Sequence, residues 1–194
     1  MSVRRPLAIG PLVGLLALWL PSAAAASDAV WNLLRGGGQV VLMRHAVTTP
    51  GVGDPAGFRL DDCATQRNLT GAGREEARRV GAAFRARDIP VGRVLSSRWC
   101  RCLETARLAF GRAEAWADGL DSLFEERAKD RERTATLRRF VSARPTSGNL
   151  VLVTHGANIR SLTGIQPAPG ELVVLTPGES DFRVSGRFAP AALE

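Results

Sequence analysis

The segment VVLMRHA, from Val40 to Ala46, decides the fold class, because it joins a short apolar run to an Arg-His pair. The only other histidine of the sequence stands in a similar setting, in LVLVTHGA from Leu150 to Ala157. Continuous apolar runs of this length are typical of strands that are buried on both faces. The two runs therefore predict two buried strands, each of which delivers a histidine to a comparable position.

Strand-type and helix-type segments alternate along the rest of the chain. After Thr70, a typical N-cap residue, Ala77, Val80, Gly81 and Phe84 recur on one face of an expected helix. The patterns predict helices at 30–34, 71–87, 98–110, 130–143 and 158–163, and strands at 39–43, 93–96, 113–117, 149–154, 171–176 and 182–188. This alternation predicts a three-layer α/β/α sandwich with a mostly parallel central sheet, to which the last two strands can add in antiparallel fashion.

A long loop is expected at 46–68, because glycine and proline are frequent in its first half. Loops of this length usually carry a function, and this one directly follows the first histidine. We expect it to border the site. Its Arg67 either contacts a ligand bound at that site or anchors the loop in a salt bridge.

The N-terminus has the layout of a secretory signal peptide. Arg4 and Arg5 form a basic start, an apolar stretch follows at 7–20, and small residues at 24–26 provide a cleavage site. A transmembrane anchor is disfavoured, since a spanning helix needs about 20 apolar residues. We expect a signal peptide at 1–26, a single domain at 27–194, no stable membrane anchor after cleavage, and a periplasmic or secreted location.

The chain is basic, with a net charge of +7, and Lys129 is its only lysine. Genome composition can explain much of this arginine bias, but arginine also binds phosphate through two parallel hydrogen bonds. The sequence has no basic run with interleaved aromatic residues and no tyrosine. A nucleic-acid partner is therefore not expected.

The three cysteines are Cys63, Cys100 and Cys102. In an oxidising compartment one pair can form a disulfide and leave one free thiol. Cys100 and Cys102 are too close in sequence to pair comfortably in regular structure. We therefore expect Cys63 to pair with one of them. A zinc site is the alternative, but the usual paired C-x-x-C spacing is absent.

Arg44, His45, Arg101 and His155 form a candidate phosphate site, because ligands of α/β sheets bind beyond the carboxyl ends of the strands. Two guanidinium groups and two imidazoles suit a dianion. A neutral imidazole can attack phosphorus and form a covalent phosphohistidine. The second imidazole would lie at the N-terminus of the following helix, which favours anions. Departure of an alcohol also needs a proton from a nearby carboxyl group.

A metal site built on His45 and His155 is a further alternative. Neither histidine has a carboxylate or a cysteine within a few residues, and the H-E-x-x-H motif is absent. We therefore expect a site with no metal and no cofactor.

Three blocks of the sequence resemble the histidine phosphatase superfamily, the phosphoglycerate mutase-like proteins. LMRHAVTT resembles the R-H-G-x-[ST] signature, with Ala46 in place of the usual glycine. SSRWCRCLETA, at 96–106, resembles the S-x-x-x-R-x-x-x-T-A block, and VTHGANIRSL, at 153–162, resembles the second histidine block. The blocks occur in the family's order, and with segment 70–86 the resemblance spans most of the expected mature chain.

The resemblance implies a role for each matched residue. His45 would accept the phosphoryl group, Arg44 and Arg101 would bind the phosphate, and His155 would complete the pocket. Thr48 matches the hydroxyl residue of the signature and would join the phosphate site. The proton donor of the family is an acidic residue between the second and third blocks. Glu125 is favoured within LDSLFEER, and Glu126 and Asp121 remain alternatives.

The function that follows is a metal-independent phosphomonoester hydrolase, acting through a phosphohistidine on a small phosphorylated substrate. Two alternatives stay open. One is a protein phosphohistidine phosphatase, although a cytoplasmic partner would conflict with a signal peptide. The other is a phosphate- or polyanion-binding module without turnover.

Overall fold

A six-stranded sheet forms the centre of the computed structural model, which describes residues 23–125 and 127–193. The strand order is β3-β2-β4-β1-β5-β6. Neighbouring strands from β3 to β1 are parallel, and β5 runs antiparallel to both β1 and β6. The strands are β1 (Val40–Arg44), β2 (Val91–Ser96), β3 (Glu114–Ala115), β4 (Asn149–Thr154), β5 (Leu172–Pro177) and β6 (Phe182–Phe188).

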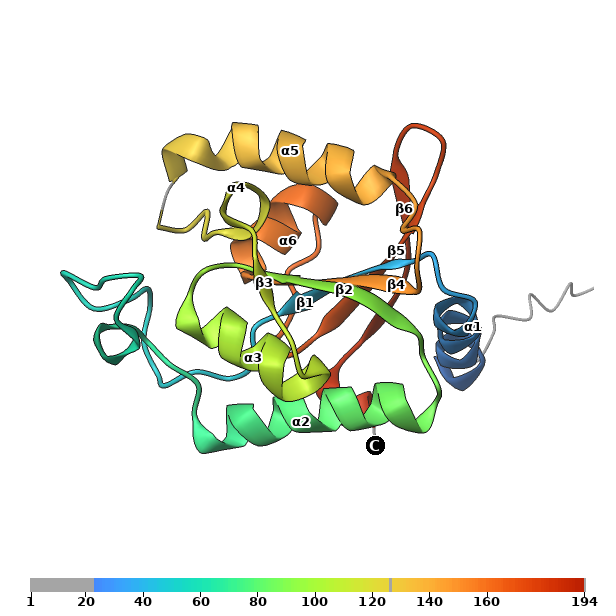
Figure 1. Ribbon diagram of the computed structural model, residues 1–194, viewed down its shortest axis with the longest axis horizontal. Helices are drawn as coiled ribbons and strands as arrows, with labels where there is room; N and C mark the ends of the chain where they lie inside the picture. The colour runs from blue at the N-terminus through green and yellow to red at the C-terminus, as the bar shows by residue number, and fades with distance from the viewer. Residues whose placement is uncertain (1–22, 126, 194) are drawn as a thin grey trace, which may run out of the picture.

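Helices cover both faces of this sheet (Figure 1). α1, α2 and α3 lie on one side, and α4, α5 and α6 lie on the other. The helices are α1 (Ala23–Arg35), α2 (Gly71–Ala86), α3 (Cys100–Phe110), α4 (Ala117–Leu120), α5 (Asp130–Ser142) and α6 (Gly156–Thr163). The predicted three-layer α/β/α sandwich with a mostly parallel sheet is confirmed.

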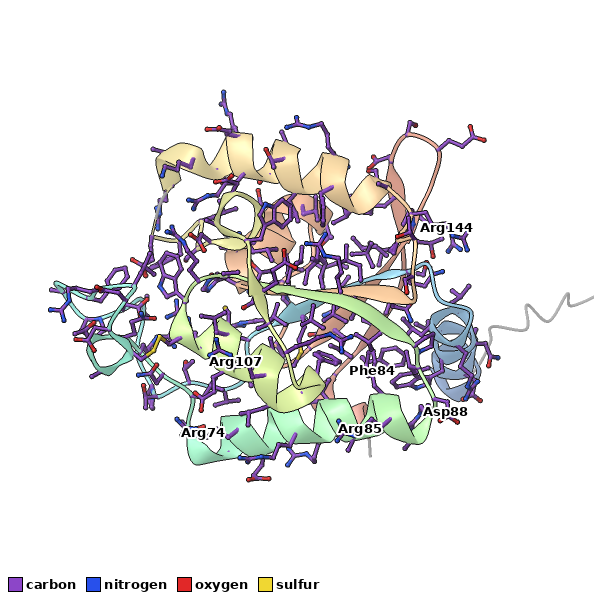
Figure 2. The ribbon with its side chains drawn as sticks, viewed as in Figure 1. Arg74, Phe84, Arg85, Asp88, Arg107 and Arg144 are labelled. Atoms are coloured by element: carbon purple, nitrogen blue, oxygen red, sulfur yellow. A yellow bond between two sulfur atoms is a disulfide. The ribbon has the colours of Figure 1, made fainter. Side chains whose placement is uncertain are left out.

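The alternation of side chains along β1 explains the two layers. Val41 and Met43 pack against the α1–α3 layer, whereas Val40 and Leu42 pack against the α4–α6 layer. All four side chains are fully buried, and burial of each contributes about 1.5–3 kcal/mol. Figure 2 shows Phe84 of α2 in the first of these layers, where its ring meets the edge of Trp31 from α1.

Most elements lie within two residues of their predicted positions, but two predictions are wrong. The first helix begins at Ala23 rather than at residue 30, because a run of alanines, which favour helix most strongly, extends it. The strand expected at 113–117 contains only Glu114 and Ala115, and α4 follows at once. A helix of one turn has no periodic pattern that a sequence could reveal.

The signal peptide expected at 1–26 lies mostly outside the described residues. The core contacts of α1 come from Val30, Trp31 and Leu34, all of which follow the expected cleavage point. Within the described ranges, no helix combines the length and the hydropathy that a membrane span requires.

The carboxyl ends of the parallel strands position the site. His45 directly follows β1, Ser97 follows β2 and His155 follows β4, and these three strands are adjacent in the sheet. The expected long loop leaves from the same end and extends away from the sheet (teal in Figure 1) before α2 begins. Sequence-distant segments are thereby brought to one edge.

Candidate active site

The two histidines of the chain face each other at the end of the sheet. Their ring centroids are 5.6 Å apart, and the rings meet edge to face. The backbone N–H of His45 donates to the Thr154 carbonyl, so the pairing of β1 with β4 extends to the histidine itself. Both residues are almost fully buried. The predicted convergence of the two imidazoles is confirmed.

The contacts of His45 define which ring nitrogen is free to react. Nδ1 lies 2.9 Å from the carbonyl oxygen of Ala46, and because a carbonyl only accepts, Nδ1 carries the hydrogen. Nε2 therefore keeps its lone pair. Burial lowers the pKa of His45 to about 3 and outweighs the hydrogen bond to Ala46, while the charges of Arg101, Arg44 and Arg67 lower the pKa further. The imidazole is neutral at physiological pH, as a nucleophile must be.

His155 is held by a short chain of hydrogen bonds. Its Nε2 lies 2.9 Å from Ser97 Oγ, and Ser97 Oγ lies 3.3 Å from Asp121 Oδ1. Nη2 of Arg101 lies 3.5 Å from His155 Nδ1 and can only donate, so Nε2 is the protonated nitrogen. Burial, followed by the charge of Arg101, lowers the pKa of His155 well below its ordinary value. This imidazole is also neutral.

Two arginines present unpaired donors next to the histidines. Arg44 donates through Nη1 to the Pro167 carbonyl at 2.8 Å. The Nε atoms of Arg44 and Arg101 are buried and have no hydrogen-bond partner among the described residues. A buried donor without a partner costs about 1–3 kcal/mol, a cost that an oxyanion ligand at this position would remove.

Asp54 fixes Arg101, a role that no pattern in the sequence indicates. Its carboxylate accepts two hydrogen bonds from Arg101 Nη1, at 2.8 and 2.9 Å, and one from Trp99 Nε1 at 2.9 Å. The backbone N–H of Arg67 also donates to it. No motif marks Asp54, because its partner Arg101 lies 47 residues away in the sequence. Its place in the loop beside the first histidine was the one available signal.

These side chains surround a cavity of about 400 Å³. The first residues of α6 form one wall, so that the N-terminus of this helix adjoins the same space as the arginines. His155 is the N-cap residue of α6, as predicted. Its lining includes Arg44, His45, Arg67, Arg101, Phe124, Glu125, His155, Ala157 and Arg160.

Of the three candidate proton donors, Glu125 lines the cavity. Its Oε1 is buried and has no hydrogen-bond partner among the described residues. Asp121 is placed elsewhere: its carboxylate accepts from Ser97 Oγ and from the backbone and side chain of Arg98. Glu126 lies outside the described residues. The geometry therefore favours Glu125.

A sequence model of the histidine phosphatase superfamily (branch 1) matches residues 40–127. This segment is therefore similar in sequence to the histidine phosphatase superfamily. The match begins with β1 and includes His45, Arg101 and Glu125, whereas His155 lies beyond it. No curated protein matches the chain significantly.

The folds of three solved phosphatase structures are similar to this one over most of the chain. The phosphoserine phosphatase of Entamoeba histolytica, in complex with 3-phosphoglyceric acid, aligns with a TM-score of 0.60 and 14% identity over 80% of this chain and 99% of that one. The protein histidine phosphatase SixA, complexed with tungstate, gives 0.53 and 16% over 80% and 99%. The mycobacterial glucosyl-3-phosphoglycerate phosphatase gives 0.54 and 15% over 75% and 94%. At these identities the likeness concerns the fold.

Thr48 of the superfamily signature does not line the cavity. Its hydroxyl accepts a hydrogen bond from Arg67 Nη1, and Arg67 itself lines the cavity and donates through Nε to the Gly53 carbonyl. The predicted direct place of Thr48 in the phosphate site is therefore corrected: the structure places it behind Arg67. Arg67 both borders the cavity and anchors the loop, so the two interpretations of this residue are not exclusive.

Ala46 is accommodated where the superfamily signature has glycine. Its backbone does not adopt a positive φ, since Asp88 is the one non-glycine residue in the described part of the chain that does. The Ala46 methyl group is fully buried in a small cluster with Leu69 and Ala77. The turn after the nucleophile candidate therefore has no need of glycine here.

A disulfide between Cys63 and Cys100 links the loop to the first residue of α3. Cys102 is free and buried, with its sulfur 3.6 Å from His155 Nε2, and burial raises its pKa to about 12. The expected pairing of Cys63 with one of the two later cysteines is confirmed. The described residues contain no cluster of three histidine, cysteine or acidic side chains that could hold a metal ion.

Proposed function

We propose that this protein is a phosphomonoester hydrolase that works through a covalent phosphohistidine at His45 and needs no metal. The observation that carries the proposal is the free Nε2 of a neutral His45, which faces a cavity lined by arginines and by one carboxyl group, Glu125. This set contains a nucleophile, charge stabilisation and a proton source.

In the first step the phosphate of the substrate binds against Arg44 and Arg101. Nε2 of His45 attacks phosphorus in line with the leaving oxygen, so that an N–P bond forms as the P–O bond to the alcohol breaks. Glu125 in its acid form gives its proton to that oxygen, and a neutral alcohol leaves. The neutral His155 donates through Nε2 to Ser97, which keeps its Nδ1 directed toward Arg101 beside the transferring group.

In the second step water replaces the alcohol. The Glu125 carboxylate takes a proton from this water as its oxygen attacks phosphorus. The N–P bond breaks, the electron pair returns to Nε2, and Glu125 is again in its acid form. Phosphate then leaves, and the balance is one ester and one water consumed for one alcohol and one phosphate.

The charges around the cavity support chemistry without a metal. Arg44, Arg67, Arg101 and Arg160 all line it, against Glu125 and the buried Asp54. A divalent cation would be repelled by this set, while the guanidinium groups supply the charge that a metal would otherwise provide. The cavity volume of about 400 Å³ suits a small phosphorylated substrate.

A periplasmic or secreted location is part of the proposal. It is supported by the N-terminal segment Arg4–Ala26 and by the disulfide between Cys63 and Cys100, which persists in oxidising compartments. Mass spectrometry of the protein recovered from the cell envelope or the medium is expected to show an N-terminus at Ser27. Recovery from the cytoplasm alone, with an intact Met1, would refute the location.

Hydrolysis of p-nitrophenyl phosphate in the presence of EDTA tests the function. We expect turnover by the wild-type protein, none by His45→Ala, and full turnover by Arg107→Gln, which alters an exposed arginine of α3 (Figure 2) that does not line the cavity. Loss of wild-type activity in EDTA would refute metal independence. Phosphate binding without any turnover would instead favour the non-catalytic binding module.

A further inference from the structure

A second cavity, of about 430 Å³, adjoins the catalytic one. Phe124, Ala157 and Arg160 line both cavities, so these residues form the common wall between them. Arg127 lines only the second cavity. A phosphate bound to Arg44 and Arg101 would leave its alcohol portion to extend toward this wall.

Two arginines of the second cavity, Arg160 and Arg127, have no carboxylate partner among the described residues. Arg160 lies in the last turn of α6 and is exposed, and it has no side-chain partner among the described residues. The guanidinium of Arg127 lies 5.4 Å from the centre of the Phe124 ring, a contact that leaves its N–H donors free for a ligand. By contrast, the exposed Arg78 and Arg138 each lie within hydrogen-bond distance of a carboxylate.

One carboxylate, that of Asp130, also lines the second cavity and opposes the charge of the two arginines. Its Oδ1 accepts hydrogen bonds from the hydroxyls of Thr134, at 3.1 Å, and Ser161, at 2.8 Å. Asp130 is therefore tied to α5 and α6 and offers no salt bridge to either arginine among the contacts of the described residues. With two arginines and one carboxylate, the described lining of the second cavity carries a net positive charge.

We infer that the second cavity binds the leaving group and selects phosphomonoesters whose alcohol carries a second anionic group, a carboxylate or another phosphate. Arg160, at the common wall, and Arg127, which lines only the second cavity, donate to this second anion. Phe124 covers the carbon skeleton between the two charges, since it is one of the exposed apolar side chains at the mouth. This inference rests on the proposed function, because it takes the catalytic cavity as the phosphate site.

Matched pairs of esters test the inference. 3-Phosphoglycerate differs from glycerol 3-phosphate by a carboxylate in place of a hydroxymethyl group, and fructose 1,6-bisphosphate differs from fructose 6-phosphate by the second phosphate. We expect kcat/KM to be about tenfold higher for the ester with the second anionic group in at least one pair. A hydrogen bond to a charged group typically changes affinity by about this factor. The pair that shows the preference identifies the second group as carboxylate or phosphate.

Variants assign the preference to the two arginines. Arg127→Gln, which lies outside the catalytic cavity, is expected to raise KM for the preferred ester about tenfold, with kcat little changed, and to leave p-nitrophenyl phosphate turnover as it was. Arg160→Gln, which also lines the catalytic cavity, is expected to lower kcat/KM about tenfold more for the preferred ester than for p-nitrophenyl phosphate. Arg107→Gln is the matched control and is expected to change neither substrate. An equal loss for all substrates would show a structural role and overturn the inference, as would a wild-type protein with no preference in either pair.

Binding separates this inference from the proposed function. Calorimetry with His45→Ala is expected to show tighter binding of the preferred ester than of its partner, and Arg160→Gln in the same background is expected to remove the difference. If the wild-type protein hydrolyses nothing, the proposed function fails while calorimetry still decides the second-anion site. If it hydrolyses p-nitrophenyl phosphate but binds both members of each pair equally, only the second-anion site is refuted.

Discussion

Asp54 and Arg101 form a buried ion pair in which one guanidinium nitrogen lies 2.8 and 2.9 Å from the two carboxylate oxygens. The side chain of Asp54 is fully buried, and that of Arg101 is 3% exposed. Arg101 belongs to α3, whereas Asp54 belongs to the loop after His45. The loop therefore sets the orientation of the arginine that we propose to bind phosphate, and does not merely border the cavity.

Removing the charge of Asp54 is expected to affect stability and binding together. Asp54→Asn leaves Arg101 without its buried counter-charge, and breaking such a pair typically costs about 3–5 kcal/mol. We expect the free energy of unfolding in urea to fall by about 3 kcal/mol and KM for p-nitrophenyl phosphate to rise.

Asp62→Asn in the same loop is the control for this variant. Asp62 pairs with Arg59 on the surface and caps a short 3-10 helix at Cys63–Thr65, a cap that asparagine also provides. Its loss should cost less than about 1 kcal/mol. Equal effects of the two substitutions would contradict the role assigned to Asp54.

Glu125→Gln tests the proton donor. Alkyl phosphates need their leaving oxygen protonated, whereas p-nitrophenolate leaves readily without a proton. The variant is therefore expected to lose at least about a hundredfold in kcat on an alkyl ester and much less on p-nitrophenyl phosphate. Steady-state kinetics on both substrates gives the comparison.

Asp121→Asn provides the contrast, because Asp121 supports Ser97 and Arg98 from outside the cavity. We expect it to lower stability and to slow both substrates by a similar factor. If Asp121→Asn, and not Glu125→Gln, discriminates between alkyl and aryl esters, the acid has been assigned to the wrong residue.

The disulfide between Cys63 and Cys100 is expected to stabilise the fold. Its two cysteines are 37 residues apart, and closing a loop of this length restricts the unfolded chain by about 4 kcal/mol. Urea unfolding with and without reductant should differ by about this amount. Thiol titration of the oxidised protein under denaturant should find one free thiol, Cys102, and three free thiols would contradict the pairing.

Burial of His45 predicts a dependence of stability on pH. Its pKa is lowered from 6.5 to about 3 in the folded protein, so the unfolded chain binds this proton more strongly. The contribution of His45 to stability is complete above pH 6.5 and is lost as pH falls toward 3, by about 1.4 kcal/mol per pH unit.

A variant isolates this contribution from that of other titrating groups. Between pH 6.5 and 4 the free energy of unfolding of the wild-type protein is expected to fall more steeply than that of His45→Gln, as measured by urea titration at each pH. Parallel pH profiles would show that His45 titrates alike in the folded and unfolded states.

The sequence predicted the parts of the fold that a local pattern encodes. β1 and β4 are uninterrupted apolar runs, and Thr70 caps α2 through its hydroxyl, as its residue type suggests. His45 and His155 were placed together because both follow such strands. The α4 turn was not predicted, since Leu120 is held there by the α4–α6 layer and by no pattern of its own.

The contacts around the site join residues that are far apart in the sequence, so they could not be predicted in the same way. Asp54 sits in a glycine- and proline-rich loop that resembles any surface turn, yet its carboxylate is fully buried against α3. The choice between Glu125 and Asp121 was open for the same reason. Only the cavity shows which of the two carboxyl groups faces the histidines.

The most direct test of the account is the detection of the phosphoryl group on His45. The wild-type protein is mixed with p-nitrophenyl phosphate in EDTA, quenched with base within one turnover, digested and analysed by mass spectrometry. The account predicts one acid-labile phosphoryl group on the peptide that contains His45, and none in His45→Ala. Turnover without this adduct, together with residual activity of His45→Ala, would contradict it.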